Sequence, residues 1–404
     1  MGLIGAASSL FLLVFALAST GAGRQVGHNP SDGREIFRFD TFGDEQLWTD
    51  ELRMHEVVQT VSPDTALNLL GLKVDVQALP RAVTKALEAG DVNLSDPSVT
   101  RLLLSLNAVV GVIGTVNSSD QITSIGITCA LCHSTVDDSF APGIGRRLDG
   151  WPNLDLNPGL ILSLSRTTKL DAETKKDFAT WGPGKYDARH HAFNGSDFIL
   201  LNGTGPSVPS VIPPAYGLQG VGFETFTGDG PISYWNAYVG IGQMGGQGTF
   251  IDPRIPLTII QTPDLVTPKL AALLEYQLRL RTPEPPKGSF DKFAARQGEQ
   301  VFHEVGCATC HVPPTYTDVL NNAITGIPFL HSPSEVGTDP RYAERSVTEL
   351  YRTTPLRGLW QHAPYFHDGS APDLMAVVNH YDQLFGLNLT PQQKFNLVEF
   401  LKSL

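Results

Sequence analysis

The feature that most constrains this chain is a short cysteine pattern that occurs twice. The chain has four cysteines, and all four belong to the two copies, Cys129-Ala-Leu-Cys132-His133 and Cys307-Ala-Thr-Cys310-His311. C-x-x-C-H is the attachment site of c-type haem, in which both thiols form thioethers with haem vinyl groups and the histidine becomes the proximal iron ligand. One helical turn brings side chains at this spacing to one face. The sequence therefore predicts two covalently bound haem c groups, with His133 and His311 as proximal ligands.

Other uses of the cysteines agree less well with the pattern. Disulfides are the common fate of cysteines in exported proteins, but they do not require a shared pattern that ends in histidine. A thioredoxin-like redox pair needs one C-x-x-C in a βαβ setting rather than two with trailing histidines. A single zinc site would have to join two cysteine pairs that lie far apart in the chain.

The beginning of the chain resembles an export signal. Residues 1–22 carry no charge, and their apolar stretch at 10–17 has the length of a signal core rather than of a membrane span. The positively charged start of a typical signal is missing, and an uncleaved anchor is the alternative interpretation. Because no later stretch has the length of a span, we expect a signal peptide at 1–22 and a periplasmic or otherwise exported bacterial protein.

The charge balance excludes one class of partner. The chain has 29 Lys and Arg against 41 Asp and Glu, a net charge of −12. Nucleic-acid binding needs a basic surface, so we expect no nucleic-acid partner. The hydrophobic fraction of 41% is enough for a sizeable core, and 39 glycines with 29 prolines indicate long loops.

Helices are predicted on both sides of the second cysteine motif. Residues 291–302 form an amphipathic pattern in which Gly298 would allow another helix to cross closely. Near the end, Thr390 can cap a helix that has Pro391 at its first position. Such a crossing is the cytochrome c arrangement. We expect a mainly α protein with two cytochrome c-like haem domains, at 23–282 and 283–404, the first including an extra N-terminal helical region.

Two strings downstream of the second motif carry a family resemblance: Thr-Pro-Leu-Arg-Gly-Leu at 354–359 and Ala-Pro-Tyr-Phe-His-Asp-Gly-Ser at 363–370. They resemble the bacterial di-haem cytochrome c peroxidase superfamily, which includes MauG-type enzymes and, more distantly, the di-haem rubber oxygenases. The resemblance implies a peroxidatic haem in the N-terminal domain and a C-terminal haem that passes electrons to it. It also leaves room for one calcium ion held largely by main-chain carbonyls around Pro364.

The resemblance suggests a distal ligand for the second haem. In the family this ligand is a Met or, in MauG-like members, a Tyr on the helix after His-Asp-Gly, and counting along this chain leads to Tyr381. Tyr381 shares a helix face with the apolar positions 374, 377 and 378, whereas Met375 and His380 lie off that face. A core tyrosine is the alternative. The resemblance places His367 near the same haem, as a catalytic candidate or a structural hydrogen-bonding residue.

The first haem site departs from the family pattern. The family's peroxidatic Glu-Met pair corresponds best to Gln243-Met244, and the family's Trp before Asp-Gly is replaced by Gly228. A neutral amide cannot take a proton from peroxide as a carboxylate can. Met244 is a candidate sixth ligand, with loop packing as the alternative. The pair His190-His191 is another candidate, although paired histidines are usually solvated.

Three tryptophans could relay electrons, or be core aromatics: Trp151, Trp181 and Trp235.

The sequence leaves three classes of function open. The first is an exported di-haem oxidoreductase that accepts electrons from a small redox protein or another donor and acts on peroxide or an unknown substrate. The second is a pure electron-transfer cytochrome. The third is an oxygenase or protein-radical enzyme of the rubber-oxygenase or MauG type.

Overall fold

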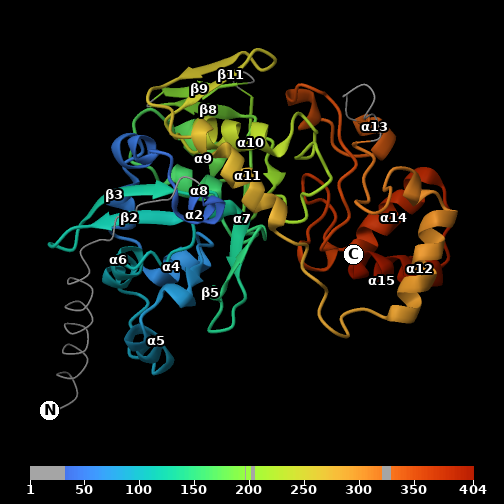
Figure 1. Cartoon of the computed structure of the whole chain (residues 1–404), viewed down its shortest axis with the longest axis horizontal. Helices are drawn as coiled ribbons and strands as arrows, with labels where there is room; N and C mark the ends of the chain where they lie inside the picture. Colours follow the sequence, from blue (N-terminus) through green and yellow to red (C-terminus); the bar gives the residue numbers. More distant parts are fainter. Residues whose placement is uncertain (1–31, 196, 202–204, 321–328) are drawn as a thin grey trace.

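In the computed structural model, residues 32–195, 197–201, 205–320 and 329–404 are described, and they form two lobes (Figure 1). The first lobe carries the first cysteine motif and the described residues that precede it. The second lobe carries the second motif and the C-terminus. The predicted signal peptide lies outside the described residues.

The first lobe combines short helices with small sheets. Its helices and helical turns are α2 (Gly33–Phe39), η1 (Gln46–Glu51), α3 (Met54–Val58), α4 (Pro63–Asn68), η2 (Val76–Ala78), α5 (Arg81–Glu88), α6 (Pro97–Ser105), α7 (Ala130–His133), α8 (Pro158–Ser163), α9 (Ala172–Phe178), α10 (Ile232–Tyr238), η3 (Val239–Gln243), η4 (Thr267–Lys269) and α11 (Leu270–Arg279). Capping side chains define several starts, because Asp32, Ser62, Asp96 and Asp171 each accept a backbone N–H of the first turn.

All strands of the described residues pair in twos, and all lie in the first lobe. One pair is parallel, β1 (Val74–Asp75) with β5 (Ile144–Gly145). The antiparallel pairs are β2 (Val112–Val116) with β3 (Ile122–Ile127), β4 (Ser134–Val136) with β6 (Arg147–Asp149), β7 (Lys185–Tyr186) with β10 (Ser210–Val211), β8 (His191–Asn194) with β9 (Asp197–Leu200), and β11 (Thr249–Asp252) with β12 (Leu257–Ile260). The expectation of an essentially helical preface therefore missed the β2–β3 hairpin, which packs in the first core cluster.

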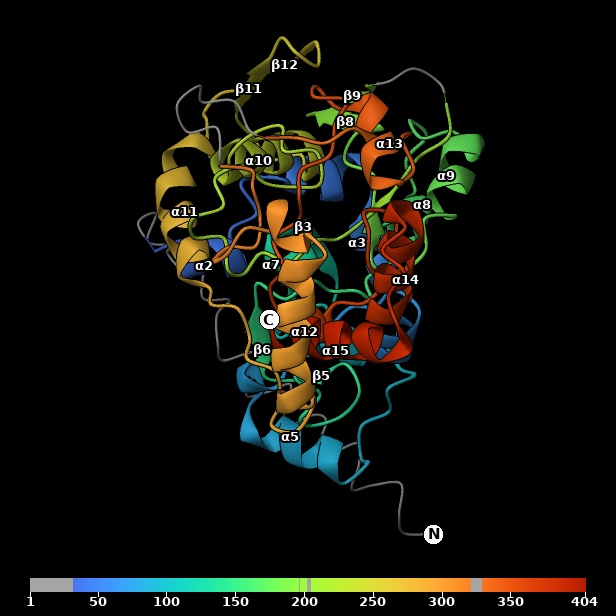
Figure 2. The ribbon, with the colours of Figure 1, turned by 90° about the vertical axis from the view of Figure 1, so that its right-hand side faces the viewer.

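The second lobe is helical, with α12 (Lys292–Glu304), η5 (Cys307–Thr309), α13 (Pro333–Val336), η6 (Ala343–Arg345), η7 (Leu359–Gln361), α14 (Leu374–Phe385) and α15 (Pro391–Ser403). The predicted crossing is confirmed: α12 crosses α15 (Figure 2). A Cβ on Gly298 would lie 2.0 Å from the carbonyl oxygen of Asn396, so only glycine permits this approach. Thr390 begins α15 with a capping box completed by Gln393.

Aromatic and charged side chains join the two lobes. Trp151 of the first lobe meets Trp360 of the second edge-on, with ring centroids 5.6 Å apart, and it also contacts Tyr216. The Tyr216 hydroxyl donates to the carbonyl of Gly358. The buried Glu224 carboxylate pairs with Arg352 of the second lobe at 3.3 Å. These contacts connect the lobes that carry the two cysteine motifs.

Within the described residues, no helix combines the length and the apolar character needed to cross a membrane.

Candidate haem sites

The first cysteine motif lies on α7 and is prepared for haem attachment. The N–H of His133 donates to the carbonyl of Cys129 at 3.2 Å, which closes the turn. His133 Nδ1 lies 3.1 Å from the carbonyl oxygen of Pro213. That contact fixes a tautomer with hydrogen on Nδ1 and directs Nε2 toward an iron ligand position. Burial lowers the pKa of His133 to about 4, so its ring stays neutral, as iron binding requires.

The second motif repeats this arrangement on η5. His311 Nδ1 lies 2.9 Å from the carbonyl oxygen of Tyr316. Burial lowers the pKa of His311 as well. In both motifs a main-chain carbonyl thus holds the histidine ring in the orientation that a proximal haem ligand needs.

The cysteines also agree with thioether formation. All four are free thiols. Burial raises the pKa of Cys129 and of Cys132 to about 12, which disfavours the thiolates that a zinc site would need. The donor set therefore fits haem c, with Cys129, Cys132, Cys307 and Cys310 as attachment residues and His133 and His311 as proximal ligands.

Gln243 ends η3 in the first lobe, inside a network of neutral groups. Its Oε1 accepts the hydroxyl of Tyr186 at 2.8 Å. Its Nε2 donates to the carbonyl of His191 at 2.7 Å and to the hydroxyl of Tyr238 at 3.0 Å. The thiol of Cys132 contributes to the raised pKa of Tyr186, after the larger effect of burial, so the network lies near the first motif.

Met244, the neighbour of Gln243, is buried in the core of the first lobe. Its carbonyl oxygen accepts the indole N–H of Trp48 at 2.9 Å, and its side chain packs in the cluster that also contacts Cys129. The structure thus places Met244 in a packed core close to the first motif.

The expectation that His190 and His191 are solvated was wrong. His191 is fully buried and His190 is 6% exposed. The reason is tertiary packing, because His191 begins β8, where the rings of Phe178 and Trp181 lie against its imidazole. Burial lowers the pKa of His191 to about 3, and its Nδ1 has no hydrogen-bond partner among the described residues. The sequence identifies this pair as a candidate, and the structure places the neutral ring of His191 in a residue whose carbonyl bonds to Gln243.

Tyr381 lies on α14 beside the second motif. Burial raises the pKa of Tyr381 to about 12, with smaller contributions from the thiols of Cys310 and Cys307. Its ring stacks on Phe385 and meets Phe366. Met375, half-buried on the same helix, packs in the core cluster of the second lobe. The structure therefore brings Tyr381 close to both attachment cysteines.

Both ring nitrogens of His367 have hydrogen-bond partners. Its Nε2 lies 3.0 Å from the hydroxyl of Tyr351, and its Nδ1 lies 3.2 Å from the hydroxyl of Thr338. Its carbonyl accepts the N–H of Val211 from the first lobe. Both ring nitrogens are occupied, so this arrangement supports the hydrogen-bonding role rather than the catalytic one.

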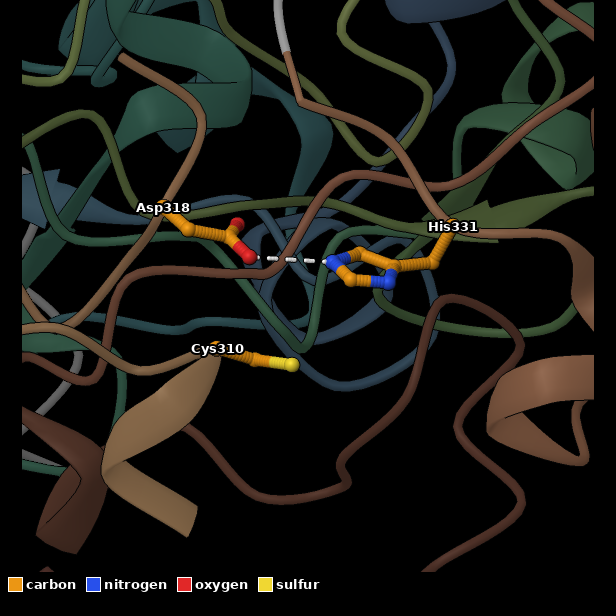
Figure 3. Close-up of side chains that lie close together, drawn as sticks. All are labelled: Cys310, Asp318 and His331. Atoms are coloured by element: carbon orange, nitrogen blue, oxygen red, sulfur yellow. Dashed lines mark hydrogen bonds and ion pairs between the residues drawn. The ribbon is translucent and has the colours of Figure 1, made fainter. Parts of the chain in front are cut away.

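A charged cluster that sequence reasoning missed borders the second motif (Figure 3). Ligand atoms of Cys310, Asp318 and His331 lie within 4.8 Å of one another. His331 contacts Asp318 at 3.1 Å and Glu335 at 2.8 Å. The hydrogen bonds to Asp318 and then to Cys310 raise the pKa of His331 to about 11. Because Cys310 belongs to the haem motif, the cluster supplies a buried charge at the edge of the second haem site.

A lysine side chain contacts the loop in which the resemblance implies a calcium ion. The Lys185 ammonium donates to the main-chain carbonyl of Asp368 at 2.8 Å. The carbonyl of Tyr365, next to Pro364, already accepts the N–H of Ala371. A carbonyl oxygen has two lone pairs, so these hydrogen bonds do not decide the matter, and the calcium ion stays a prediction.

Comparisons with known proteins agree with the site. The family described as RoxA-like, cytochrome c-like matches residues 350–384. The methylamine utilization protein MauG of Methylorubrum extorquens is 31% identical over 144 residues, covering 32% of this chain and 38% of that protein. Cytochrome c551 peroxidase of Pseudomonas aeruginosa is 30% identical over 148 residues, covering 33% of this chain and 42% of that protein.

Two solved structures are similar over about half of this chain. A MauG-like protein associated with microbial copper homeostasis has a TM-score of 0.36 at 19% identity, covering 54% of this chain and 84% of that one. Hydrazine synthase of Kuenenia stuttgartiensis has a TM-score of 0.32 at 21% identity, covering 50% and 75%. The chain spans about two fifths of the length of the curated relatives it matches. In sequence, about a third of the chain is thus similar to MauG and to cytochrome c551 peroxidase, and residues 350–384 match the family described as RoxA-like, cytochrome c-like.

Proposed function

We propose that this chain is an exported, periplasmic di-haem c-type cytochrome, a peroxidase-like oxidoreductase in which one haem passes electrons to the other. The observation that carries the proposal is the repeated histidine arrangement, in which a main-chain carbonyl holds Nδ1 of both His133 and His311. Haem bound at the two motifs would supply iron that exchanges single electrons. The haem domains would be 23–282 and 283–404, and the electron donor a small redox protein or another reductant.

The contact between the lobes supports an electron path. Trp151 follows Gly150, whose N–H donates to the carbonyl of His133 at 2.8 Å. Trp360 follows Leu359, which packs in the cluster that includes Cys307. The two indole rings meet at 5.6 Å between centroids. Aromatic rings therefore lead from the surroundings of one motif to those of the other, and we assign the relay to Trp151 rather than to Trp181 or Trp235.

Tyr381 is the proposed distal ligand of the second haem. An unliganded hydroxyl at this site would stay protonated, because burial raises its pKa. Ligation would require loss of that proton, and an anionic oxygen favours oxidised iron. Met375 remains the alternative ligand.

The network around Gln243 favours a second candidate function, a pure electron carrier. The Gln243 amide oxygen accepts from the Tyr186 hydroxyl, and its NH₂ group donates to the Tyr238 hydroxyl and to the carbonyl of His191. It offers no carboxylate to accept a proton from peroxide. If the first site does turn over peroxide, the neutral ring of His191, with its unpartnered Nδ1, is the group that can accept the proton.

Electronic and EPR spectra of the holoprotein before and after hydrogen peroxide test the two functions. A peroxidase-like protein has one high-spin ferric haem whose signal changes within the mixing time. A carrier has two low-spin haems and no peroxide response, and this result would refute the peroxidase proposal.

A paired substitution examines the first site directly. Gln243→Glu introduces the missing carboxylate, and we expect peroxide turnover to rise about tenfold or more, since general-base catalysis typically contributes 10²–10⁴-fold. Gln300→Glu makes the same chemical change at an exposed position of α12 and should leave turnover unchanged. Equal turnover in both variants would exclude Gln243 from the reacting site.

A further inference from the structure

The first lobe contains a cavity that the haem sites do not use. Its volume is about 70 Å³, and its walls come from α3, α4, α6, α8 and the β2–β3 hairpin. Thr100 and Trp48 are the lining residues whose side chains carry a polar group, and both present only carbon atoms to the cavity, because its surface is entirely apolar. Protein interiors are close-packed, so an internal space of this size is uncommon.

Water is a poor occupant of such a space. A single water needs roughly 10–15 Å³ of this kind of volume, together with two to four polar partners. The cavity has room for on the order of five to seven water-sized groups but offers them no hydrogen bond. An apolar molecule of about that many non-hydrogen atoms would lose no hydrogen bond on entry and would gain contact with the walls.

The cavity lies behind the first haem motif rather than in front of it. On the short helix α7, Cys129, Cys132 and His133 share one face, since successive residues are about 100° apart. Leu131 then points roughly the opposite way, and its side chain lines the cavity. Of the first motif, Leu131 therefore lines the cavity, whereas Cys129, Cys132 and His133 are not among its lining residues.

Two of the residues that line the cavity also belong to the surroundings of the first haem motif. Leu131 stands between the two attachment cysteines. Trp48 also lines the cavity, and its indole N–H donates to the carbonyl of Met244, the neighbour of Gln243, at 2.9 Å. At the outer end, Leu164 lines the cavity and is 40% exposed, which marks where the cavity approaches the surface.

We propose that this cavity is a binding site for a small, uncharged apolar compound, such as a short hydrocarbon or a single aromatic ring, located behind the first haem motif. The size and enclosure exclude a peptide or a protein segment. The site is independent of the reaction assigned to the haems. Because Leu131 and Trp48 line the cavity, an occupant would change the packing of α7, and this change would alter the surroundings of the first haem.

Toluene and phenol are suitable probes for the holoprotein, measured by isothermal titration calorimetry. The apolar walls predict that toluene binds at least tenfold more tightly than phenol, whose hydroxyl would lose its hydrogen bonds to water. Saturation with toluene should also shift the absorption of the first haem by a small but reproducible amount. Absence of toluene binding up to its solubility, or equal affinity for phenol, would overturn the proposal.

Cavity-filling variants locate the site. Ala66→Leu places three further carbons into the cavity and should weaken toluene binding at least tenfold while the haem content stays that of the wild type. Ala82→Leu makes the same change on the exposed face of α5 and should bind toluene like the wild type. If Ala66→Leu fails to fold, Val61→Phe fills the cavity from a half-buried position. Undiminished toluene binding in a folded filling variant would show that the ligand sits elsewhere.

Discussion

Gly298→Ala should selectively destabilise the second lobe, because of the helix crossing beside the second haem motif. An added Cβ would lie 2.0 Å from the carbonyl oxygen of Asn396, which is backbone and cannot rotate away. An ordinary contact needs about 3.4 Å, so α12 and α15 would have to separate by about 1.4 Å. A gap of this size forfeits about half of the dispersion contact between facing side chains.

The free-energy cost follows from the side chains at the crossing. Four buried apolar residues face it: Val301, Phe302, Leu397 and Phe400. Burial of each of these side chains stabilises the fold by about 2 kcal/mol, so loss of half of that contribution at all four costs about 4 kcal/mol. Alanine has a higher helix propensity than glycine, which offsets about 1 kcal/mol of this cost. We expect a net loss of about 3 kcal/mol, or roughly 10 °C in the unfolding midpoint of a unit of this size.

Differential scanning calorimetry of the holoprotein measures this effect. The transition of the second lobe should move down by roughly 10 °C, while that of the first lobe stays in place. Gly205→Ala is the matched control, since nothing lies within 4 Å of a Cβ at that position. A shift in Gly298→Ala no larger than in the control would refute the reasoning that this glycine is required by the close crossing.

Three further predictions concern the haem groups. Changing both Cys307 and Cys310 to Ala should reduce the covalently bound haem from two to one per chain, as measured by intact mass in acid. His311→Gly should leave a thioether-linked haem that binds added imidazole with a spectral change, and an unaltered axial spectrum without imidazole would exclude His311 as the ligand. Tyr381→Phe should make one haem high-spin, whereas Met375→Leu should change the EPR spectrum little; the opposite pair of results would make Met375 the ligand and favour simple electron transfer.

The parts of the fold that the sequence predicted depend on local chemistry. The C-x-x-C-H spacing, the Thr390 cap and the glycine at 298 each impose a requirement on a few neighbouring residues, and the structure meets the last two in the predicted way. The histidine pair at 190–191 shows the opposite case. Phe193 and Phe198 lie near it in the sequence and contact the His191 ring, but the cover is completed by Phe178 and Trp181, which precede the pair and meet it only in the folded lobe.

The cluster beside Cys310 could not be predicted for a related reason. Asp318 and His331 are 13 residues apart in the sequence, and no local spacing rule brings them together beside the second motif. A weak local signal did exist, since His331 and Glu335 are four residues apart. That spacing is common on protein surfaces, however, and gains its meaning only from the burial of His331.

The two haem motifs of this chain have unlike surroundings, and this difference bears on the direction of electron flow. The first motif neighbours a network of neutral groups, in which Gln243 bonds to Tyr186 and Tyr238. The second borders His331, whose hydrogen bond to Asp318 raises its pKa and favours the protonated ring. A nearby positive charge favours the reduced iron, but the carboxylates of Asp318 and Glu335 offset it, and an anionic Tyr381 ligand would favour the oxidised iron. If haem binds at both motifs, we therefore expect the distal ligand to have the larger effect on the potential of the second haem, and the neutral, buried network beside Gln243 on that of the first.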